Sequence, residues 1–273
     1  MIVEHAYAKL NLALDVVGKR KDGFHHLNMI VMPLQLADVL TFEASDDIVL
    51  NCDENIPNNV VYQTAKLMQQ TFNIQQGVAI TLKKHIPIGS GLGGESADIA
   101  ATIRGLNRFW QLNLSQETLE EIALSLGSDT LFCLYNQTAY VSGRGEHLQF
   151  LDVPPIKHIY LCISEYPIST KDAFALYQPN KKDISFEQLL ESYQNKQYEW
   201  FFKQTYNDLL ETAYLLDKTL KNTYFRLLKR YEIAYMTGSG STLFLIENHE
   251  KKLNIDEIKT ISRRKVLKTA PFR

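Results

Sequence analysis

The sequence predicts an α+β protein with two lobes, residues 1–153 and 154–273. Strand-like alternation and helical spacing are mixed in the first half of the chain, whereas residues 185–230 are mainly helical in pattern. The consecutive prolines of Asp152–Pro155 interrupt strand hydrogen bonding and stiffen the connection, so we place the boundary between the lobes there. The 273 residues, 45% of them hydrophobic, are enough to bury one large core or two joined ones.

Apolar residues that either alternate or form runs in the first lobe predict strands near residues 2–17, 27–43 and 78–84. Helical spacing predicts helices over Asn59–Phe72 and Ser96–Trp110. In the second of these helices the apolar residues recur at steps of 4, 3 and 4, which gives the helix one apolar face.

The remaining elements follow from caps, turns and apolar runs. In chain order we expect a helix over Ser115–Leu126 with Ser115 as its N-cap, a hairpin over Thr138–Phe150 that turns at Ser142–Glu146, a strand at His158–Ser164, helices across 185–230, a strand-turn-strand at 232–246, and a solvated last strand and tail rich in Lys and Arg.

Composition narrows the functional class. The formal net charge is -2, which gives no reason to expect nucleic acid or an anionic membrane as a partner. The sequence shows no signal-peptide pattern at its start and no run of 18 apolar residues, so we expect a cytoplasmic protein. The three scattered cysteines, Cys52, Cys133 and Cys162, suggest buried thiols rather than a disulfide framework or a metal site.

The most informative segment is Ile86–Ala97, a strand end followed by a glycine-rich loop and the start of a helix. Glycines allow positive φ and close backbone approach, so successive N–H groups can point at an anion, and a helix N-terminus adds unsatisfied donors. The segment contains G-x-G-x-x-G, but it follows some eighty residues of mixed structure, unlike a dinucleotide-binding first strand, and no G-x-x-x-x-G-K-[ST] loop is present. A glycine turn that only packs a strand on a helix is the alternative.

Three motifs together carry a family resemblance. Ala6–Leu12 and Lys19–His25 resemble P-A-K-[IL]-N-L and K-R-x-D-G-Y-H, the opening signature of the kinases of the methylerythritol phosphate pathway, within the GHMP kinase superfamily. Ile86–Ala97 resembles their second motif, I-P-x-G-[AS]-G-L-G-G-G-S-[SA]-[DN], and Met236–Thr242 their third, M-S-G-S-G-P-T. Three shorter segments are also similar to the family: Asn59–Tyr62, Gly127–Asp129 and Gly143–Glu146.

The resemblance implies a GHMP kinase fold, with an S5-like N-terminal lobe and an α/β-plait C-terminal lobe. It implies ATP-dependent phosphorylation, with Mg²⁺, of the 2-hydroxyl group of cytidine-diphospho-methylerythritol in the non-mevalonate route to isoprenoid precursors. The expected partner is this small-molecule substrate, with no nucleic acid or membrane, and the protein is expected to be a monomer or a homodimer.

The resemblance also assigns catalytic residues. Asp129 matches the carboxylate that accepts the proton of the acceptor hydroxyl, and Lys9 matches the lysine that keeps this carboxylate ionised. The residues alone allow plainer interpretations, in which Lys9 is a solvated residue on an edge strand and Asp129 is a helix cap.

Binding residues are assigned in the same way. The expected ATP site consists of Pro87, Ile88, Gly89, Ser90, Gly91, Leu92, Gly93, Gly94, Glu95, Ser96 and Ala97, with Asn59 at the adenine, and Ser96 facing the phosphates or their Mg²⁺. The expected acceptor site consists of Asn11, Phe24, His25, Thr170, Phe174, Gly238 and Ser239, with Phe24 and Phe174 stacking on cytosine. Each of these aromatic residues could instead belong to the core.

The chain departs from the family pattern at four places: Tyr7 for proline, Glu95 for a loop glycine, Thr130-Leu131 for [IV]-P, and Ser241 for the proline of the third motif. Glu95 puts a carboxylate beside the expected phosphates, and a like charge at about 5 Å costs on the order of 3 kcal/mol at an effective dielectric near 20. Its side chain could instead point to solvent or bind Mg²⁺. The alternatives are therefore another GHMP kinase with a different acceptor, or a nucleotide-binding paralogue with impaired catalysis.

Overall fold

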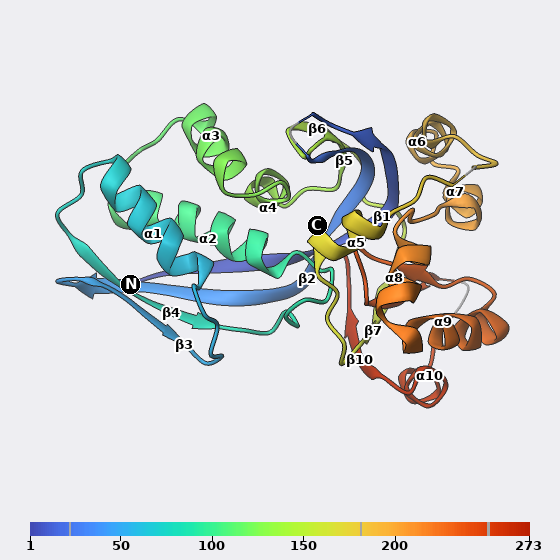
Figure 1. The fold of residues 1–273 in the computed structure, drawn as a ribbon. Helices are drawn as coiled ribbons and strands as arrows, with labels where there is room; N and C mark the ends of the chain where they lie inside the picture. The colour runs from blue at the N-terminus through green and yellow to red at the C-terminus, as the bar shows by residue number, and fades with distance from the viewer. Residues whose placement is uncertain (22, 181, 250–251) are drawn as a thin grey trace. The chain divides into compact units, whose positions relative to one another are not determined.

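The computed structural model describes residues 1–21, 23–180, 182–249 and 252–273 (Figure 1). Contacts within the chain divide it into two compact units. The first unit comprises residues 1–8, 36–87 and 93–136, and the second comprises residues 9–35, 88–92 and 137–273. Strands β1 (Ile2–Lys19) and β2 (His25–Ser45) contribute residues to both units. Asp152–Pro155 lies inside the second unit, so the contact units do not coincide with the boundary predicted there.

The sheet of the first unit is built around β4 (Gly77–Lys83). On one side β4 pairs in parallel with β3 (Ile48–Cys52), and on the other it pairs antiparallel with the last part of β2, from Val39 opposite Lys83 to Ser45 opposite Gly77. The predicted strand at 78–84 is confirmed within one residue. Strand β3 was not predicted, because its five residues carry too short an alternation to be recognised.

Four helices accompany this sheet: α1 (Val60–Thr71), α2 (Gly94–Phe109), α3 (Gln116–Leu126) and α4 (Thr130–Tyr135). The first three confirm the helices expected in this part of the chain, and Asn59 and Ser115 cap α1 and α3 through their side-chain oxygens. In Figure 1, α1 and α2 lie side by side over the strands, and the two helices contact each other.

Gly105 explains how closely α2 approaches the sheet. A Cβ atom at this position would lie 2.3 Å from ring carbons of Phe42, a fully buried residue of β2. The apolar face predicted for the helix is also buried, with Ile103 and Leu106 fully covered. The start of α2, which carries part of the glycine-rich segment, is therefore fixed on a tightly packed base.

The second unit contains a four-stranded antiparallel sheet in the order β10-β7-β9-β8. Its strands are β7 (His158–Ile163), β8 (Tyr235–Met236), β9 (Leu243–Glu247) and β10 (Lys265–Thr269). The predicted hairpin is confirmed as β5 (Ala139–Gly143) and β6 (His147–Phe150), and β5 pairs with the first part of β2.

Six helices lie in the described part of the second unit: α5 (Thr170–Leu176), α6 (Phe186–Gln194), α7 (Tyr198–Gln204), α8 (Leu210–Leu216), α9 (Lys218–Tyr231) and α10 (Ile255–Ser262). The expectation of helices across 185–230 is confirmed. The expectation of a solvated basic C-terminal segment is wrong at Arg264, whose side chain is only 6% exposed in an ion pair with Asp217.

The structure contains two sheets, and each is accompanied by its own set of helices, which confirms the α+β class. Cys133 and Cys162 are buried and form no disulfide, whereas Cys52 is only partly buried, so the expectation of buried thiols is wrong at Cys52. Burial raises the pKa of Cys162 to about 12, which makes its thiol unreactive. Across the described ranges, no helix is both long enough and apolar enough to span a membrane.

Candidate nucleotide and acceptor site

The glycine-rich segment bends through three glycines with positive φ: Gly89 at 63°, Gly91 at 77° and Gly93 at 71°. Glycine adopts these angles without the steric cost that other residues incur. The segment passes from the second unit to the first between Leu92 and Gly93, and helix α2 begins at Gly94. The predicted order of loop and helix is confirmed.

Within the second unit, the backbone of Gly91 packs closely against the third motif. A Cβ atom on Gly91 would lie 2.6 Å from the carbonyl oxygen of Thr237, and one on Gly238 would lie 2.7 Å from the carbonyl oxygen of Gly91. Both positions are therefore closed to any side chain. This part of the second motif and the third motif form one glycine-lined junction, although they are far apart in the sequence.

The first motif joins the same junction through β1. The backbone N–H of Lys9 donates to the carbonyl oxygen of Leu92 at 2.9 Å, and the N–H of Asn11 donates to Oγ1 of Thr237 at 2.9 Å. The ammonium of Lys9 donates to Oδ1 of Asn11 at 2.7 Å. Lys9 is 5% exposed and Asn11 is 2% exposed, so the interpretation of Lys9 as a solvated edge residue is wrong.

In the first unit, the Gly127–Asp129 segment lies against the first turn of α2. A Cβ atom on Gly127 would lie 3.7 Å from Oγ of Ser96 and 2.8 Å from Oγ1 of Thr130. Asp129 precedes α4 without making a side-chain cap hydrogen bond, and it is half-buried. Asp129 is therefore at the N-cap position of α4 but does not cap the helix with its side chain, and the structure brings Ser96 close to the segment that carries Asp129.

Glu95 is the second residue of α2 and is exposed. A carboxylate in the first turn of a helix interacts favourably with the helix dipole and with solvent, which gives Glu95 a stabilising role apart from any ligand. Its exposure also lets water screen the repulsion that the sequence predicted toward phosphate.

Asn59 has an unused donor. Its Oδ1 accepts a hydrogen bond from the N–H of Val61 at 3.0 Å and caps α1, whereas its buried Nδ2 finds no acceptor among the residues that the structure describes. Buried polar groups are normally hydrogen-bonded, so such a group in a binding protein suggests a ligand atom as the partner. The side chain suits a ring nitrogen or carbonyl of a nucleobase.

A buried ionic cluster that sequence reasoning missed lies at the start of α2. The ammonium of Lys84 is 2.5 Å from Asp38 Oδ2 and 2.6 Å from Asp98 Oδ2, and all three side chains are at most 6% exposed. A Cβ atom on Gly94 would lie 3.7 Å from this ammonium. The other oxygen of Asp38 accepts the N–H groups of His85 and Ile86, which fixes the strand end that leads into the glycine loop.

One cation is shared by two carboxylates in this cluster. Burial and Asp38 raise the pKa of Asp98 to about 7 despite the attraction of Lys84. The pKa of Lys84 is also raised, because the two carboxylates outweigh its own desolvation. Oδ1 of Asp98 is buried and has no partner in the described part of the chain. The only sequence signal for the cluster was the Asp or Asn that ends the second motif.

The aromatic residues expected at cytosine lie in the second unit. The rings of His25 and Phe174 stack with centroids 4.9 Å apart and planes at 20°, and Tyr177 approaches His25 edge-on at 6.4 Å. Burial and Lys19 lower the pKa of His25, which keeps a neutral ring with one donor and one acceptor near pH 7. Phe24 is 49% exposed with the guanidinium of Arg144 over its ring, so the structure pairs Phe174 with His25 rather than with Phe24.

The other acceptor-site residues meet at the third motif. The hydroxyls of Thr170 and Ser239 are 3.1 Å apart, and the Nδ2 of Asn207, which sequence reasoning missed, donates to the carbonyl oxygen of Gly238 at 2.9 Å. Asp22 of the opening signature lies outside the described residues.

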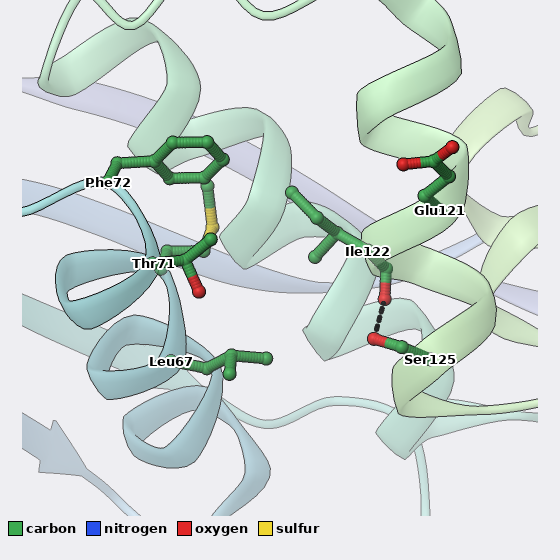
Figure 2. Close-up of a pocket in the computed structure, with 7 residues that line it drawn as sticks. Leu67, Thr71, Phe72, Glu121, Ile122 and Ser125 are labelled. Carbon is green, nitrogen blue, oxygen red and sulfur yellow. Dashed lines mark hydrogen bonds between the residues drawn. The ribbon is translucent and has the colours of Figure 1, made fainter.

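A small apolar cavity elsewhere in the first unit contains none of the expected residues. It has a volume of about 220 Å³ and is lined by Leu67, Met68, Thr71, Phe72, Glu121, Ile122 and Ser125, from α1 and α3. Figure 2 shows Leu67 and Ile122 pointing toward each other across it, with Ser125 bonded to the Ile122 carbonyl oxygen at 2.7 Å.

The described part of the chain holds no group of three or more His, Cys, Asp or Glu side chains arranged to bind a metal ion. Mg²⁺ in nucleotide sites is commonly held by one or two protein oxygens and the phosphates themselves, so a single hydroxyl such as that of Ser96 is compatible with it.

Comparison with known proteins identifies the fold and the family. Residues 59–137 match the family model of the GHMP kinases N terminal domain. A crystal structure of a 4-(cytidine 5'-diphospho)-2C-methyl-D-erythritol kinase superposes with a TM-score of 0.80 at 27% identity and covers 99% of each chain. The fold is that of the GHMP kinases, which are ATP-dependent small-molecule kinases, and the fold expected from the three motifs is confirmed.

Relatives of the same name extend the match along the chain. The 4-diphosphocytidyl-2-C-methyl-D-erythritol kinase of Bacillus pumilus (strain SAFR-032) is 37% identical over 261 residues, which cover 92% of this chain and 90% of that protein. The protein of that name in Bacillus cytotoxicus is 34% identical over 258 residues, covering 91% and 89%. The chain belongs to the 4-diphosphocytidyl-2-C-methyl-D-erythritol kinase family.

Proposed function

We propose that this protein transfers the γ-phosphoryl group of ATP to the 2-hydroxyl group of 4-diphosphocytidyl-2-C-methyl-D-erythritol, in the non-mevalonate route to isoprenoid precursors. The observation that carries the proposal is the junction at which Lys9 and Asn11 bond to the glycine-rich segment and to Thr237. It joins the expected catalytic lysine, part of the nucleotide loop and the acceptor turn in one buried network.

The ATP-binding role rests on residues Pro87–Ala97 together with Asn59. The positive-φ glycines leave backbone N–H groups unobstructed by side chains, and the first turn of α2 has N–H groups with no partner within the helix. The unused Nδ2 of Asn59 would donate to the adenine. Mg²⁺, when bound, would neutralise charge on the phosphates, and Ser96 would contribute its hydroxyl to it.

In the chemical step, Asp129 would accept the proton of the 2-hydroxyl group as its oxygen forms a bond to the γ-phosphorus. The bond between that phosphorus and the oxygen bridging to the β-phosphate breaks, and ADP leaves with the electron pair. Lys9 would stabilise the charge on the attacking oxygen. Its ammonium is pre-oriented by Asn11, which reduces the reorganisation required during reaction.

The acceptor would be held at two places. Phe24, His25 and Phe174 would bind the cytosine by stacking and by edge hydrogen bonds from the neutral His25. Asn11, Thr170, Gly238 and Ser239 would contact the remainder of the substrate. We further propose that the protein acts in the cytoplasm, as a monomer or homodimer and without nucleic acid or membrane, in keeping with its net charge of -2.

The test is phosphorus NMR of the protein with ATP, Mg²⁺ and the cytidine-diphospho substrate, in which a new phosphomonoester signal is expected. Asp129→Asn should lower kcat by roughly 100-fold or more while nucleotide binding persists, because it removes the proton acceptor without changing side-chain shape. Asp47→Asn, at an exposed turn position of the same unit, is the matched control.

Three results would each contradict a different part of the proposal. If ATP is consumed with another alcohol but not with the cytidine-diphospho substrate, the acceptor is wrong. If nucleotide binds and no acceptor is phosphorylated, the protein is a binding module. An Asp129→Asn variant with most of the wild-type kcat would remove Asp129 from the mechanism.

A further inference from the structure

Ser241 lies where the third motif of the family has proline. In the structure it makes two hydrogen bonds, and both restrain the turn formed by residues 236–242. Its hydroxyl donates to the carbonyl oxygen of Tyr166 at 2.6 Å, and its own carbonyl oxygen accepts from Nη1 of Arg264 at 2.9 Å. Ser241 is 1% exposed, so water competes little for either bond. Proline would lack the hydroxyl and would restrain the backbone through its ring instead.

Arg264 is itself anchored. Its Nη2 lies 2.9 Å from Oδ2 of Asp217, with side chains 6% and 1% exposed. Burial alone would raise the pKa of Asp217, but hydrogen bonds from Thr219 and Ser164 and the charge of Arg264 lower it, so the pair is fully ionised near neutral pH. A planar guanidinium that bonds a carboxylate and a carbonyl oxygen at once holds both in a fixed geometry.

Ser164 closes the network into a ring. Its hydroxyl donates to Oδ2 of Asp217 at 2.9 Å and accepts the N–H of Tyr166 at 3.1 Å. Bonds therefore run from Ser241 to Tyr166, to Ser164, to Asp217, to Arg264 and back to Ser241. A closed ring of buried bonds restrains each member more than an open chain of the same bonds, because no member can move without breaking two of them.

This ring of hydrogen bonds lies next to two segments of the chain, which carry the Thr170 and Ser239 hydroxyl groups expected to bind the acceptor. Tyr166 leads directly into the loop that ends at Thr170, and Ser241 ends the turn that contains Ser239, whose hydroxyl is 3.1 Å from that of Thr170. The two segments also touch, since a Cβ atom on Gly240 would lie 3.2 Å from Ile168 Cδ1. A shift of the turn would therefore change the spacing between Thr170 and Ser239.

We propose that Ser241 is a positioning residue. Held by Tyr166 and by the buried pair of Arg264 and Asp217, it fixes the positions of Ser239 and Thr170, so that their hydroxyl groups can bind the acceptor. Its hydroxyl does by hydrogen bonding what the proline ring does in the family pattern. This inference rests on the proposed function, in which Thr170 and Ser239 contact the acceptor.

The kinetic test compares Ser241→Ala, Ser241→Pro and Arg264→Lys with the wild type. Ser241→Ala should raise the acceptor KM about tenfold and leave the ATP KM within about twofold, because it removes the buried hydrogen bond to Tyr166 and loosens the turn. Ser241→Pro should return the acceptor KM close to the wild-type value. Arg264→Lys should give an intermediate increase, since lysine cannot bond both partners in the same geometry.

Two matched controls separate this effect from general destabilisation. Ser125→Ala removes a serine that bonds a backbone carbonyl at 2.7 Å in the first unit, and Arg230→Lys alters an exposed pair with Glu257. Neither should change a KM. Equal increases in both KM values in Ser241→Ala, or a lower melting temperature with unchanged KM values, would overturn the positioning role.

A second measurement does not depend on turnover. Amide hydrogen exchange across residues 236–242 should be at least about tenfold faster in Ser241→Ala than in the wild type and slow again in Ser241→Pro, because exchange reports local opening. Unchanged exchange would overturn the inference even if the proposed acceptor is wrong. A wild-type protein without activity on the cytidine-diphospho substrate, combined with accelerated exchange in Ser241→Ala, would reject the acceptor and keep the role of Ser241 in ordering the turn.

Discussion

The ammonium of Lys9 donates to the side-chain oxygen of Asn11 at 2.7 Å, two residues along the same strand and on the same face of it. Both side chains are buried, and the backbone N–H of Asn11 separately donates to Thr237. The two roles of Asn11 can therefore be tested apart, because replacing its side chain leaves the backbone bond in place.

Asn11→Ala should lower kcat about tenfold to hundredfold, since a hydrogen bond to a charged group contributes roughly 1.5 to 3 kcal/mol. Asn11→Asp keeps an oxygen for Lys9 and should retain more activity than Asn11→Ala. Asn51→Ala, at an exposed position of β3, serves as the control. Equal kcat values for Asn11→Ala and the wild type would show that Asn11 does not orient Lys9.

The charge of Glu95 should weaken nucleotide binding only modestly, because the side chain is exposed. Glu95→Gln should lower the ATP KM by about threefold to tenfold at low ionic strength, and the difference should largely disappear at 1 M salt, where the Debye length is about 3 Å. Glu117→Gln, in the first turn of α3, gives the same charge change away from the glycine loop. A loss of turnover in Glu95→Gln, with a higher Mg²⁺ requirement, would instead assign Glu95 to the metal.

Asp98 should make folding stability depend on pH. Its pKa is raised to about 7 in the folded protein, above the value near 3.9 of an unfolded chain. Between those values the folded state holds a proton that the unfolded state has released, so stability is lost as pH rises from about 4 to about 7. Each pKa unit corresponds to about 1.4 kcal/mol, which limits the loss to about 4 kcal/mol.

Asp98→Asn keeps the shape of the side chain and removes this titration. Urea unfolding at pH 5, 6, 7 and 8 should show the wild type losing stability relative to Asp98→Asn as pH rises. The Asp47→Asn variant should follow the wild type, since that residue is exposed. Parallel curves for wild type and Asp98→Asn would mean that Asp98 is already ionised throughout the range.

Phe174→Ala should raise the acceptor KM about tenfold and leave the ATP KM nearly unchanged, because one stacked ring contributes roughly 1 to 3 kcal/mol to base binding. Phe24→Ala should have an effect of the same kind, and Phe174→Tyr should preserve binding. Phe225→Ala removes a ring that is 53% exposed on α9 and should change neither KM. Unfolding of both variants, or an equal loss of ATP affinity, would assign the two rings to the core.

Local patterns in the sequence predicted the long elements well. The strand patterns of β1 and β2, the apolar face of α2 and the cap at Ser115 each depend on neighbouring residues, and the structure contains both strands, the buried helix face and the cap. Strand β3 and helix α5 were not predicted, because segments of five and seven residues are too short for a period to be distinguished.

The motifs predicted which residues belong to the candidate site but not how they are held. Apart from the Asp or Asn at the end of the second motif, the sequence did not indicate that Lys84 lies between Asp38 and Asp98, and it did not indicate that Arg264 reaches Ser241. These contacts join residues that are distant along the chain and depend on the register of the strands. The same limit explains why Lys9 on a strand and Asp129 before a short helix each allowed a plainer interpretation.

Strands β1 and β2 each begin in one unit and end in the other, and the glycine-rich segment also changes unit between Leu92 and Gly93. Neither unit is encoded by one continuous stretch of the gene. A cut at the proline pair after Val153 would leave residues 9–35 and 88–92 of the second unit on the wrong fragment. No single recombination event could therefore transplant either unit into another protein, so we expect this enzyme to have diversified by point substitution within an intact chain rather than by exchange of modules.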